Sequence, residues 1–487
     1  MTPTAQHPRG LRTLFFTEMW ERFSYYGMRA LLVLFLIKAV NAGGLGFSDE
    51  VATAIYGLYV AGVYLAALPG GWIADRLLGA QRAVWIGGLL IATGHFTLAL
   101  PSAQTFFLGL VLIVLGTGLL KPNISALVGQ LYPEGGARRD AGFTIFYMGI
   151  NLGAAIGPLI CGALGEQVNW HYGFAAAGLG MVLGLVQFRF TRERLGDIGL
   201  PPVSRGLATR RDWTVVAVAL ALIALTVAAA LGGVLKVNPL TLAKYTSGLI
   251  VTMAVAYFAW AFLFARLDLT EKKRLVVIAI LFVASAMFWA GYEQAGSSLT
   301  LFAERYTERI LPGMTGAFPA SWFQSVPPAF VILFAPVVAA LWLWLGRRGA
   351  DPSLSAKLAG GLVLLALGFL VLALGAKRAL ANGPVWPTWL IATYLLHVFG
   401  ELLVSPVGLS SVTKLAPPRL VGQMMGIWFL GTSLGNLIAG LFAGEVSGDN
   451  AAAMPARFLQ VAMTAGGLGL LLLFFTKPVR KLMAGVE

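Results

Sequence analysis

Three ionisable side chains lie close together in a segment that is otherwise apolar: Glu18, Glu21 and Arg22. The apolar stretch around them continues to Val40, which makes it long enough to cross a membrane. A charged side chain in the middle of a bilayer costs roughly 3 kcal/mol, so such charges are expected to pair or to face a wet cavity. They are therefore the first candidates for a functional site. The alternative is a helix end whose charges reach the membrane surface.

The spacing of these residues suits them to proton exchange. On a helix, Glu18, Arg22 and Tyr25 share one face with Arg29, and Glu21 lies about 60° away. A carboxylate that loses its proton gains Arg22 as an ion-pair partner, so two carboxylates beside one arginine form a natural proton switch. The polar stripe would line the wall of a cavity.

The composition places these residues in a polytopic membrane protein. The 487-residue chain is 58% apolar and 11% charged, whereas a soluble domain carries about 25% charged residues. The net charge of +14 comes from basic residues in short loops between apolar runs. This distribution is typical of cytoplasmic loops of membrane proteins rather than of nucleic-acid binding. The single cysteine, Cys161, lies within an apolar run, so we predict no intrachain disulfide.

Fourteen apolar runs approach the length of about 20 residues that a transmembrane helix needs. We expect an all-α fold with fourteen membrane spans, near 14–40, 50–78, 82–100, 103–128, 140–165, 170–190, 213–232, 245–265, 274–296, 320–345, 355–375, 387–413, 420–444 and 455–476. The loops rich in Lys and Arg fall on one side of this arrangement, so both termini are predicted to be cytoplasmic.

An internal repeat divides the chain. Lys121-Pro122 and Ser405-Pro406 occupy corresponding positions, and Phe146–Gly153 corresponds to Trp428–Gly435. Two parallel six-helix halves are the architecture of major-facilitator transporters. We therefore predict a six-helix bundle over 1–195, a linker with an inserted helix hairpin over 196–272, and a second bundle over 273–487.

Several motifs resemble signatures of the proton-dependent oligopeptide transporter (POT/PTR) family. They occur in order along most of the chain, and they are Glu18–Tyr26, Gly116–Ile124, Phe146–Gly153, Phe288–Gln294 and Gly400–Pro406. Gly71–Gly79 resembles the loop motif of the whole major-facilitator superfamily. The inserted hairpin, together with the short loop from Gly375 to Pro387, is similar to bacterial members.

The resemblance implies a proton-coupled symporter that imports di- and tripeptides by alternating access. It implies no enzyme activity and no cofactor beyond the proton, and a monomer in the bacterial inner membrane. Related symporters of another anion or zwitterion, such as nitrate or an amino acid, and a non-transporting peptide receptor are the alternatives. The sequence contains no phosphate-binding Gly-x-x-x-x-Gly-Lys-Ser/Thr loop and no His-Glu-x-x-His, which disfavours an ATP-driven pump and a metalloenzyme.

The resemblance also assigns roles to residues. Glu18, Glu21 and Arg22 would couple proton binding to conformational change. The predicted substrate-binding residues are Arg22, Tyr25, Tyr26, Arg29, Tyr64, Lys121, Tyr147, Asn151, Trp289, Glu293, Glu401, Ser405 and Trp428. Taken one at a time, the aromatic rings are more typical of helix packing. Two ion pairs, Arg29–Glu293 and Lys121–Glu401, would act as gates.

The charges themselves argue for a zwitterionic substrate. Cations (Arg22, Arg29 and Lys121) lie in the first half of the chain, and carboxylates (Glu293 and Glu401) lie in the second. A peptide carries a carboxylate at one end and an ammonium at the other, so the two sets match it. Nitrate has no ammonium for Glu401 to hold.

The chain departs from the family pattern at two positions. Pro327 stands where members commonly have an asparagine after Gln324-Ser325-Val326, so one hydrogen bond to the peptide backbone is in doubt. Gly57 stands where animal members carry a proton-linked histidine. Proton coupling is therefore expected to rest on carboxylates.

Overall fold

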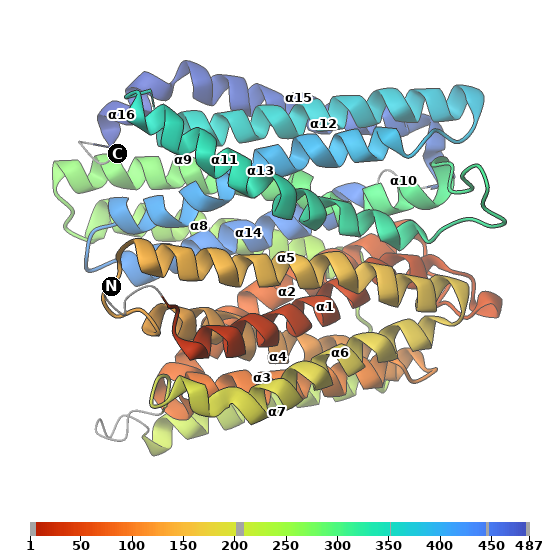
Figure 1. Ribbon diagram of the computed structural model, residues 1–487, viewed down its shortest axis with the longest axis horizontal. Helices are drawn as coiled ribbons and strands as arrows, with labels where there is room; N and C mark the ends of the chain where they lie inside the picture. Colours follow the sequence, from red (N-terminus) through yellow and green to blue (C-terminus); the bar gives the residue numbers. More distant parts are fainter. Residues whose placement is uncertain (1–5, 201–208, 351, 445–447, 484–487) are drawn as a thin grey trace. The chain divides into compact units, whose positions relative to one another are not determined.

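The computed structural model describes residues 6–200, 209–350, 352–444 and 448–483, and within these ranges the chain is helical, without a named strand (Figure 1). The predicted all-α class is confirmed. The chain forms two compact units: residues 1–35, 39–45 and 62–238 make up the first, and 36–38, 46–61 and 239–487 the second. The predicted three-part division of the chain stays a prediction.

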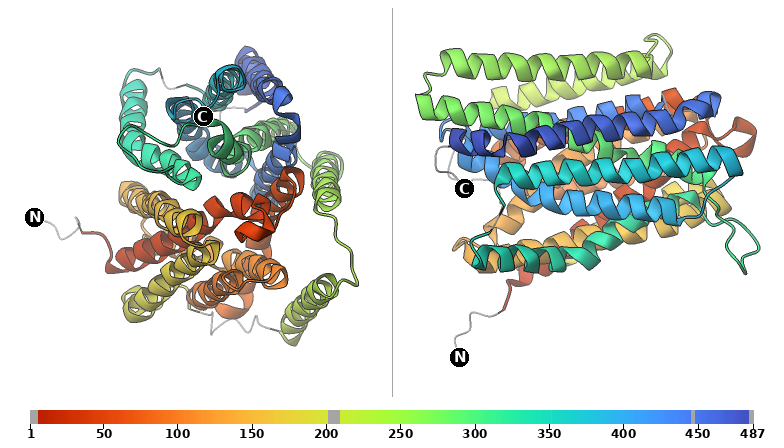
Figure 2. Two further views of the ribbon diagram at one scale, coloured as in Figure 1. Left: turned by 90° about the vertical axis from the view of Figure 1, so that its right-hand side faces the viewer. Right: turned by 90° about the horizontal axis from the view of Figure 1, so that it is seen from above.

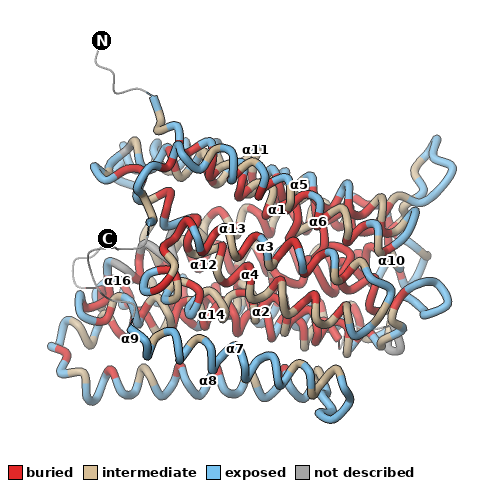
Figure 3. Tube along the Cα trace, turned by 90° about the horizontal axis from the view of Figure 1, so that it is seen from below, coloured by how far each residue is buried: buried red, intermediate tan, exposed pale blue. Residues whose placement is uncertain are grey.

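The first unit holds the elements of the first half of the chain. They are α1 (Arg9–Ile37), η2 (Val40–Ala42), the end of α2 (Asp49–Ile73), η3 (Ala74–Leu78), α3 (Ala80–Leu98), α4 (Ala103–Gln130), α5 (Gly136–Gln167), α6 (Trp170–Thr191), η4 (Arg192–Leu195) and α7 (Arg210–Leu231). Its apolar core joins α1, α3, α4 and α6 through side chains such as Leu14, Val84, Ile124 and Met181. Helix α7 contributes no buried residue and is exposed along its length (Figure 3).

The second unit contains the start of α2 and the later helices. These are α8 (Pro239–Phe264), α9 (Leu269–Tyr292), η5 (Glu293–Gly296), α10 (Ser298–Tyr306), η6 (Ala320–Ser325), α11 (Val326–Arg347), α12 (Leu354–Asn382), α13 (Thr388–Leu415), α14 (Val421–Gly444), η7 (Gly448–Ala453), α15 (Met454–Phe474) and α16 (Thr476–Leu482). Helix α12 packs along both α13 and α15, while α9 packs on α14 (Figure 2).

Twelve helical segments among the described residues are long and apolar enough to cross a membrane. Helices α1 and α3 are not among them, so the predicted count of fourteen is not confirmed. The reason lies in their polar residues. Helix α1 carries the Glu18–Glu21–Arg22 group together with Arg29, and α3 carries Gln81, Arg82 and His95.

Small residues bring α5 against α1, the helix that carries the charges. Gly149, Gly153 and Gly157 follow one another at four-residue spacing, and this spacing of small residues predicts a close contact between helices. A Cβ atom at Gly153 would lie 2.0 Å from the backbone oxygen of Met19, and one at Gly157 would lie 2.4 Å from that of Phe23. The prediction is confirmed: the two backbones touch, and this contact fixes the position of Arg22 beside α5.

Replacing Gly153 with alanine is therefore expected to destabilise the protein. The added methyl group would meet backbone atoms of α1, so the two helices must separate, and overpacking of this kind costs about 1–3 kcal/mol. Thermal unfolding in detergent measures the change. Gly71→Ala in α2 is the matched control, because a Cβ there meets nothing within 4 Å. Equal melting temperatures for the two variants would contradict the predicted contact.

Candidate functional site

The predicted triad forms on one face of α1. Arg22 Nε donates a hydrogen bond to Glu18 Oε1 at 2.7 Å, across one helical turn, and lies 2.9 Å from Glu21 Oε2. The three side chains are between 0% and 5% exposed. One guanidinium is thus shared by two carboxylates in the interior of the first unit, which makes the hypothesis of a surface helix end wrong.

The carboxylates receive fewer hydrogen bonds than they can accept. Among the described residues, Glu18 Oε2 and both oxygens of Glu21 have no hydrogen-bond partner. A buried carboxylate is costly unless a cation or a proton compensates for its charge. One arginine cannot neutralise two carboxylates, so Glu18, Glu21 and Arg22 taken by themselves carry one excess negative charge, which one proton removes.

Aromatic rings continue the polar stripe along α1. The guanidinium carbon of Arg22 lies 5.7 Å from the centre of the Tyr25 ring, and that of Arg29 lies 5.3 Å from the Tyr26 ring. The two tyrosine rings meet edge to face at 5.1 Å. Cations this close to aromatic faces are held by the ring quadrupole. Each of the two arginines on this stripe therefore has a tyrosine ring of its own helix as a neighbour.

The other predicted residues of the first unit lie on α2, α4 and α5. Lys121 Nζ sits 3.9 Å from the centre of the Tyr64 ring, and its charge also acts on Glu21. Asn151 Nδ2 donates to the backbone oxygen of Tyr147 at 2.9 Å. Helix packing in this unit therefore places Lys121 where its charge acts on Glu21, although the two residues are 100 positions apart in the sequence.

In the second unit, the carboxylate of Glu401 accepts a hydrogen bond from the hydroxyl of Tyr292. Glu401 lies on α13 and Tyr292 is the last residue of α9. Ser405, one turn after Glu401, and Trp289 are half-buried, whereas Glu293 is 4% and Trp428 8% exposed. Tyr56 donates to the backbone oxygen of Glu293 at 3.3 Å.

The two gate pairs stay predictions. Arg29 and Lys121 belong to the first unit, and Glu293 and Glu401 belong to the second. Within its own unit, each of the two cations lies against a tyrosine ring, and Glu401 accepts a hydrogen bond from a phenol hydroxyl.

Sequence reasoning missed two interactions of the second unit. Tyr292 was part of a motif but was given no role, although its position next to Glu293 marked it as a neighbour of charge. Arg305 forms a two-pronged ion pair with Asp49, with Nη1–Oδ2 at 2.5 Å and Nη2–Oδ1 at 2.8 Å. The two residues are 256 positions apart, and no local pattern connects them.

The departure at Pro327 has a local explanation. Pro327 and Pro328 open α11, where the missing backbone N–H of proline removes no helical hydrogen bond. Gln324, just before them, donates to Thr300 Oγ1 at 3.0 Å and is buried. This segment is therefore held by side-chain hydrogen bonds of its own.

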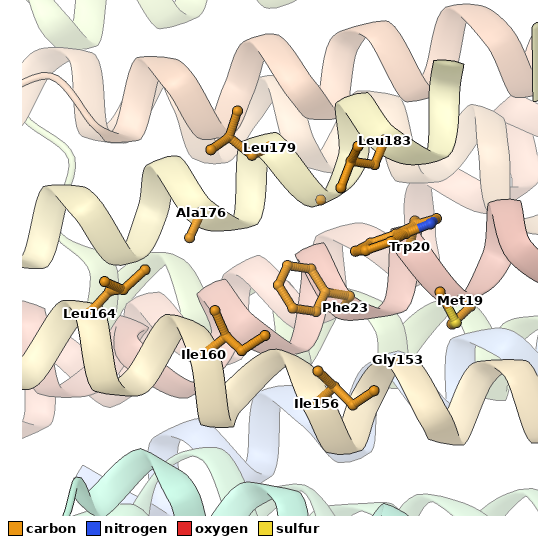
Figure 4. Close-up of a pocket in the computed structure, with 11 residues that line it drawn as sticks. Met19, Trp20, Phe23, Gly153, Ile156, Ile160, Leu164, Ala176, Leu179 and Leu183 are labelled. Atoms are coloured by element: carbon orange, nitrogen blue, oxygen red, sulfur yellow. The ribbon is translucent and has the colours of Figure 1, made fainter. Parts of the chain in front are cut away.

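An apolar cavity of about 360 Å³ lies between α1, α5 and α6 (Figure 4). Met19, Trp20 and Phe23 line it, together with residues such as Ile160 and Leu179. Ile160 and Leu179 are 45% and 57% exposed, so they point outward from the described chain. The cavity has no charged group, and the polar cluster rather than this cavity is the candidate site.

Comparison with known proteins gives consistent results. A family model described as the POT family matches residues 81–454. The chain is 42% identical to the peptide transporter YePEPT of Yersinia enterocolitica over 99% of this chain and 96% of the relative. It is 38% identical to a di-/tripeptide transporter of Lactococcus lactis subsp. cremoris over 99% of this chain and 97% of the relative.

Solved structures show the same likeness along the whole chain. A crystal structure of a mutant of the peptide transporter POT in complex with alafosfalin has a TM-score of 0.89 and 41% identity, covering 99% of this chain and 97% of its own. A POT family transporter in complex with 5-aminolevulinic acid has a TM-score of 0.87 and 33% identity, covering 98% of each chain.

Proposed function

This chain belongs to the POT family, and we propose on that basis that it is a proton-coupled symporter that imports di- and tripeptides. The family's solved structures have the major-facilitator fold, which this chain shares. Its relatives are named peptide and di-/tripeptide transporters. The chain is thus a multi-pass membrane transporter. Neither a cofactor nor a chemical step is needed, because the proton gradient supplies the driving force.

The buried triad on α1 is the observation that supports proton coupling. Its two carboxylates share a single guanidinium, and Glu21 has no hydrogen bond among the described residues. Uptake of one proton by Glu21 balances the charge with the Glu18–Arg22 pair intact. Release of the proton restores the competition for Arg22. Arg22 therefore has one ion-pair partner when Glu21 is protonated and two when it is not. We propose that this change in pairing couples the proton to a movement of the helices.

Glu401 supports a substrate with an amino group. Its carboxylate is bound by a neutral hydroxyl and keeps its charge available for an ammonium. The cations Arg29 and Lys121, each against a tyrosine ring, are suited to a carboxylate. Alternating access would exchange the site between the two sides of the membrane, with both termini cytoplasmic and the chain acting as a monomer. The membrane potential adds about 2.3 kcal/mol per charge per 100 mV.

A second candidate is a symporter of another small zwitterion. The solved relative in complex with 5-aminolevulinic acid favours it, because this ligand has an amine and a carboxylate but no peptide bond. The same charges would hold both kinds of molecule. A transport assay, rather than the charges of the site, must therefore distinguish a peptide transporter from a transporter of another zwitterion.

Uptake into proteoliposomes tests the proposal. Labelled alanyl-alanine, alanine and nitrate are offered with and without an inward proton gradient. We expect alanyl-alanine to accumulate above its external concentration only when the gradient is present. If alanine or nitrate accumulates and alanyl-alanine does not, the protein transports that other class of substrate and the peptide assignment is wrong. Peptide binding without any uptake would identify a receptor.

A further inference from the structure

The predicted acidic site residues Glu18, Glu21 and Glu401 differ in the kind of partner that holds them. Glu18 and Glu21 are paired with a cation, Arg22. Glu401 instead accepts from Tyr292, a donor without charge. An ion pair cancels the field of a carboxylate, whereas a hydrogen bond from a neutral phenol fixes the carboxylate and preserves its charge.

The ring of Tyr292 is held in place by its neighbours. It stacks on Phe288 with centroids 5.7 Å apart and meets Trp289 edge to face at 5.6 Å. The buried ring of His397, one turn before Glu401 on α13, lies 6.5 Å away. Because Tyr292 lies on α9 and Glu401 on α13, the packing of these rings between the two helices holds the Tyr292 hydroxyl at one oxygen of Glu401.

The remaining acceptor capacity of Glu401 is what a substrate would use. A carboxylate has two oxygens and can accept several hydrogen bonds. Tyr292 occupies Oε2, which fixes the orientation of the group. As a whole residue, Glu401 is only half-buried, so it is not enclosed on all sides within the second unit.

We propose that Tyr292 is a positioning residue that orients the Glu401 carboxylate to receive the ammonium group of the substrate. The proposal rests on the proposed function, since it takes the substrate to carry a free amine. Tyr292 acts through Glu401: it makes the acid rigid without neutralising it. Lysine or arginine at the same position would compete with the ligand for the negative charge.

Tyr292→Phe is the direct test, because it removes the hydroxyl and keeps the ring that packs on Phe288. The affinity for alanyl-alanine is expected to fall about tenfold, the usual scale of a lost hydrogen bond to a charged group. Binding of N-acetyl-alanyl-alanine, which has no ammonium, should change much less. Tyr257→Phe is the matched control: it removes a hydroxyl that donates to Gln423 at 3.1 Å, within the same unit.

A double variant separates positioning from a general structural role. If Tyr292 acts through Glu401, then Tyr292→Phe should cause no further loss of affinity in a Glu401→Gln background. An additional tenfold loss there, an equal loss for both peptides, or unchanged affinity in Tyr292→Phe would each overturn the proposal.

A wrong assignment of function can be distinguished from a wrong role for Tyr292. If the wild-type protein neither binds nor transports alanyl-alanine, the peptide assignment fails. The Tyr292–Glu401 contact is then tested by thermal unfolding of the two single variants and the double variant in detergent. Non-additive shifts support the positioning contact, and additive shifts reject it.

Discussion

Replacing Glu21 with glutamine is expected to abolish uphill peptide uptake and to preserve peptide exchange. Glutamine has the shape of glutamic acid but cannot release a proton, so the triad is locked in its neutral-acid form. Glu18 and Arg22 still form their 2.7 Å hydrogen bond. The transporter should therefore still move substrate in both directions, with the proton gradient no longer driving it.

Two assays in proteoliposomes measure this split. Gradient-driven accumulation of labelled alanyl-alanine should fall to the level seen without a gradient. Counterflow, in which unlabelled peptide inside exchanges for labelled peptide outside, should remain. Glu134→Gln is the control, because Glu134 forms a surface ion pair with Arg138 and is 48% exposed. Full accumulation in Glu21→Gln would remove Glu21 from the coupling mechanism.

Replacing Arg22 with leucine is expected to cause the largest loss of stability among single changes in the triad. The substitution leaves Glu18 and Glu21 buried without their shared cation. Breaking a buried ion pair by removing one partner costs about 3–5 kcal/mol, because the remaining charge is uncompensated. Thermal unfolding in detergent should show a large drop in melting temperature.

A neutral background identifies the cause. Adding Glu18→Gln and Glu21→Gln to Arg22→Leu removes both uncompensated charges, so much of the lost stability should return. Arg138→Leu is the matched control, since Arg138 is 38% exposed and surface pairs contribute roughly 0–1 kcal/mol. If the triple variant is no more stable than Arg22→Leu, the loss comes from packing rather than from charge.

The family and the triad were predictable because their signals are local. Glu18 and Arg22 are four residues apart, and a helix places such residues side by side whatever the rest of the chain does. The spacing of Gly153 and Gly157 on α5 is a local signal too, and it correctly predicted a close contact with another helix, which is α1. The apolar runs predicted the helices, although the polar residues of α1 and α3 kept those two below the apolarity of a typical span.

The partners of Glu401, Lys121 and Asp49 needed the tertiary structure. Tyr292 and Glu401 are 109 residues apart, and they meet because α9 packs against α13. The Tyr64 ring reaches Lys121 from another helix, and Arg305 reaches Asp49 across 256 residues. Periodicity tells which face of a helix is polar, but the neighbour that this face meets depends on the packing of whole helices. The sequence by itself therefore determined which residues carry charge inside the membrane, and the tertiary structure decided which of those charges is paired with a cation and which is held by a neutral hydroxyl.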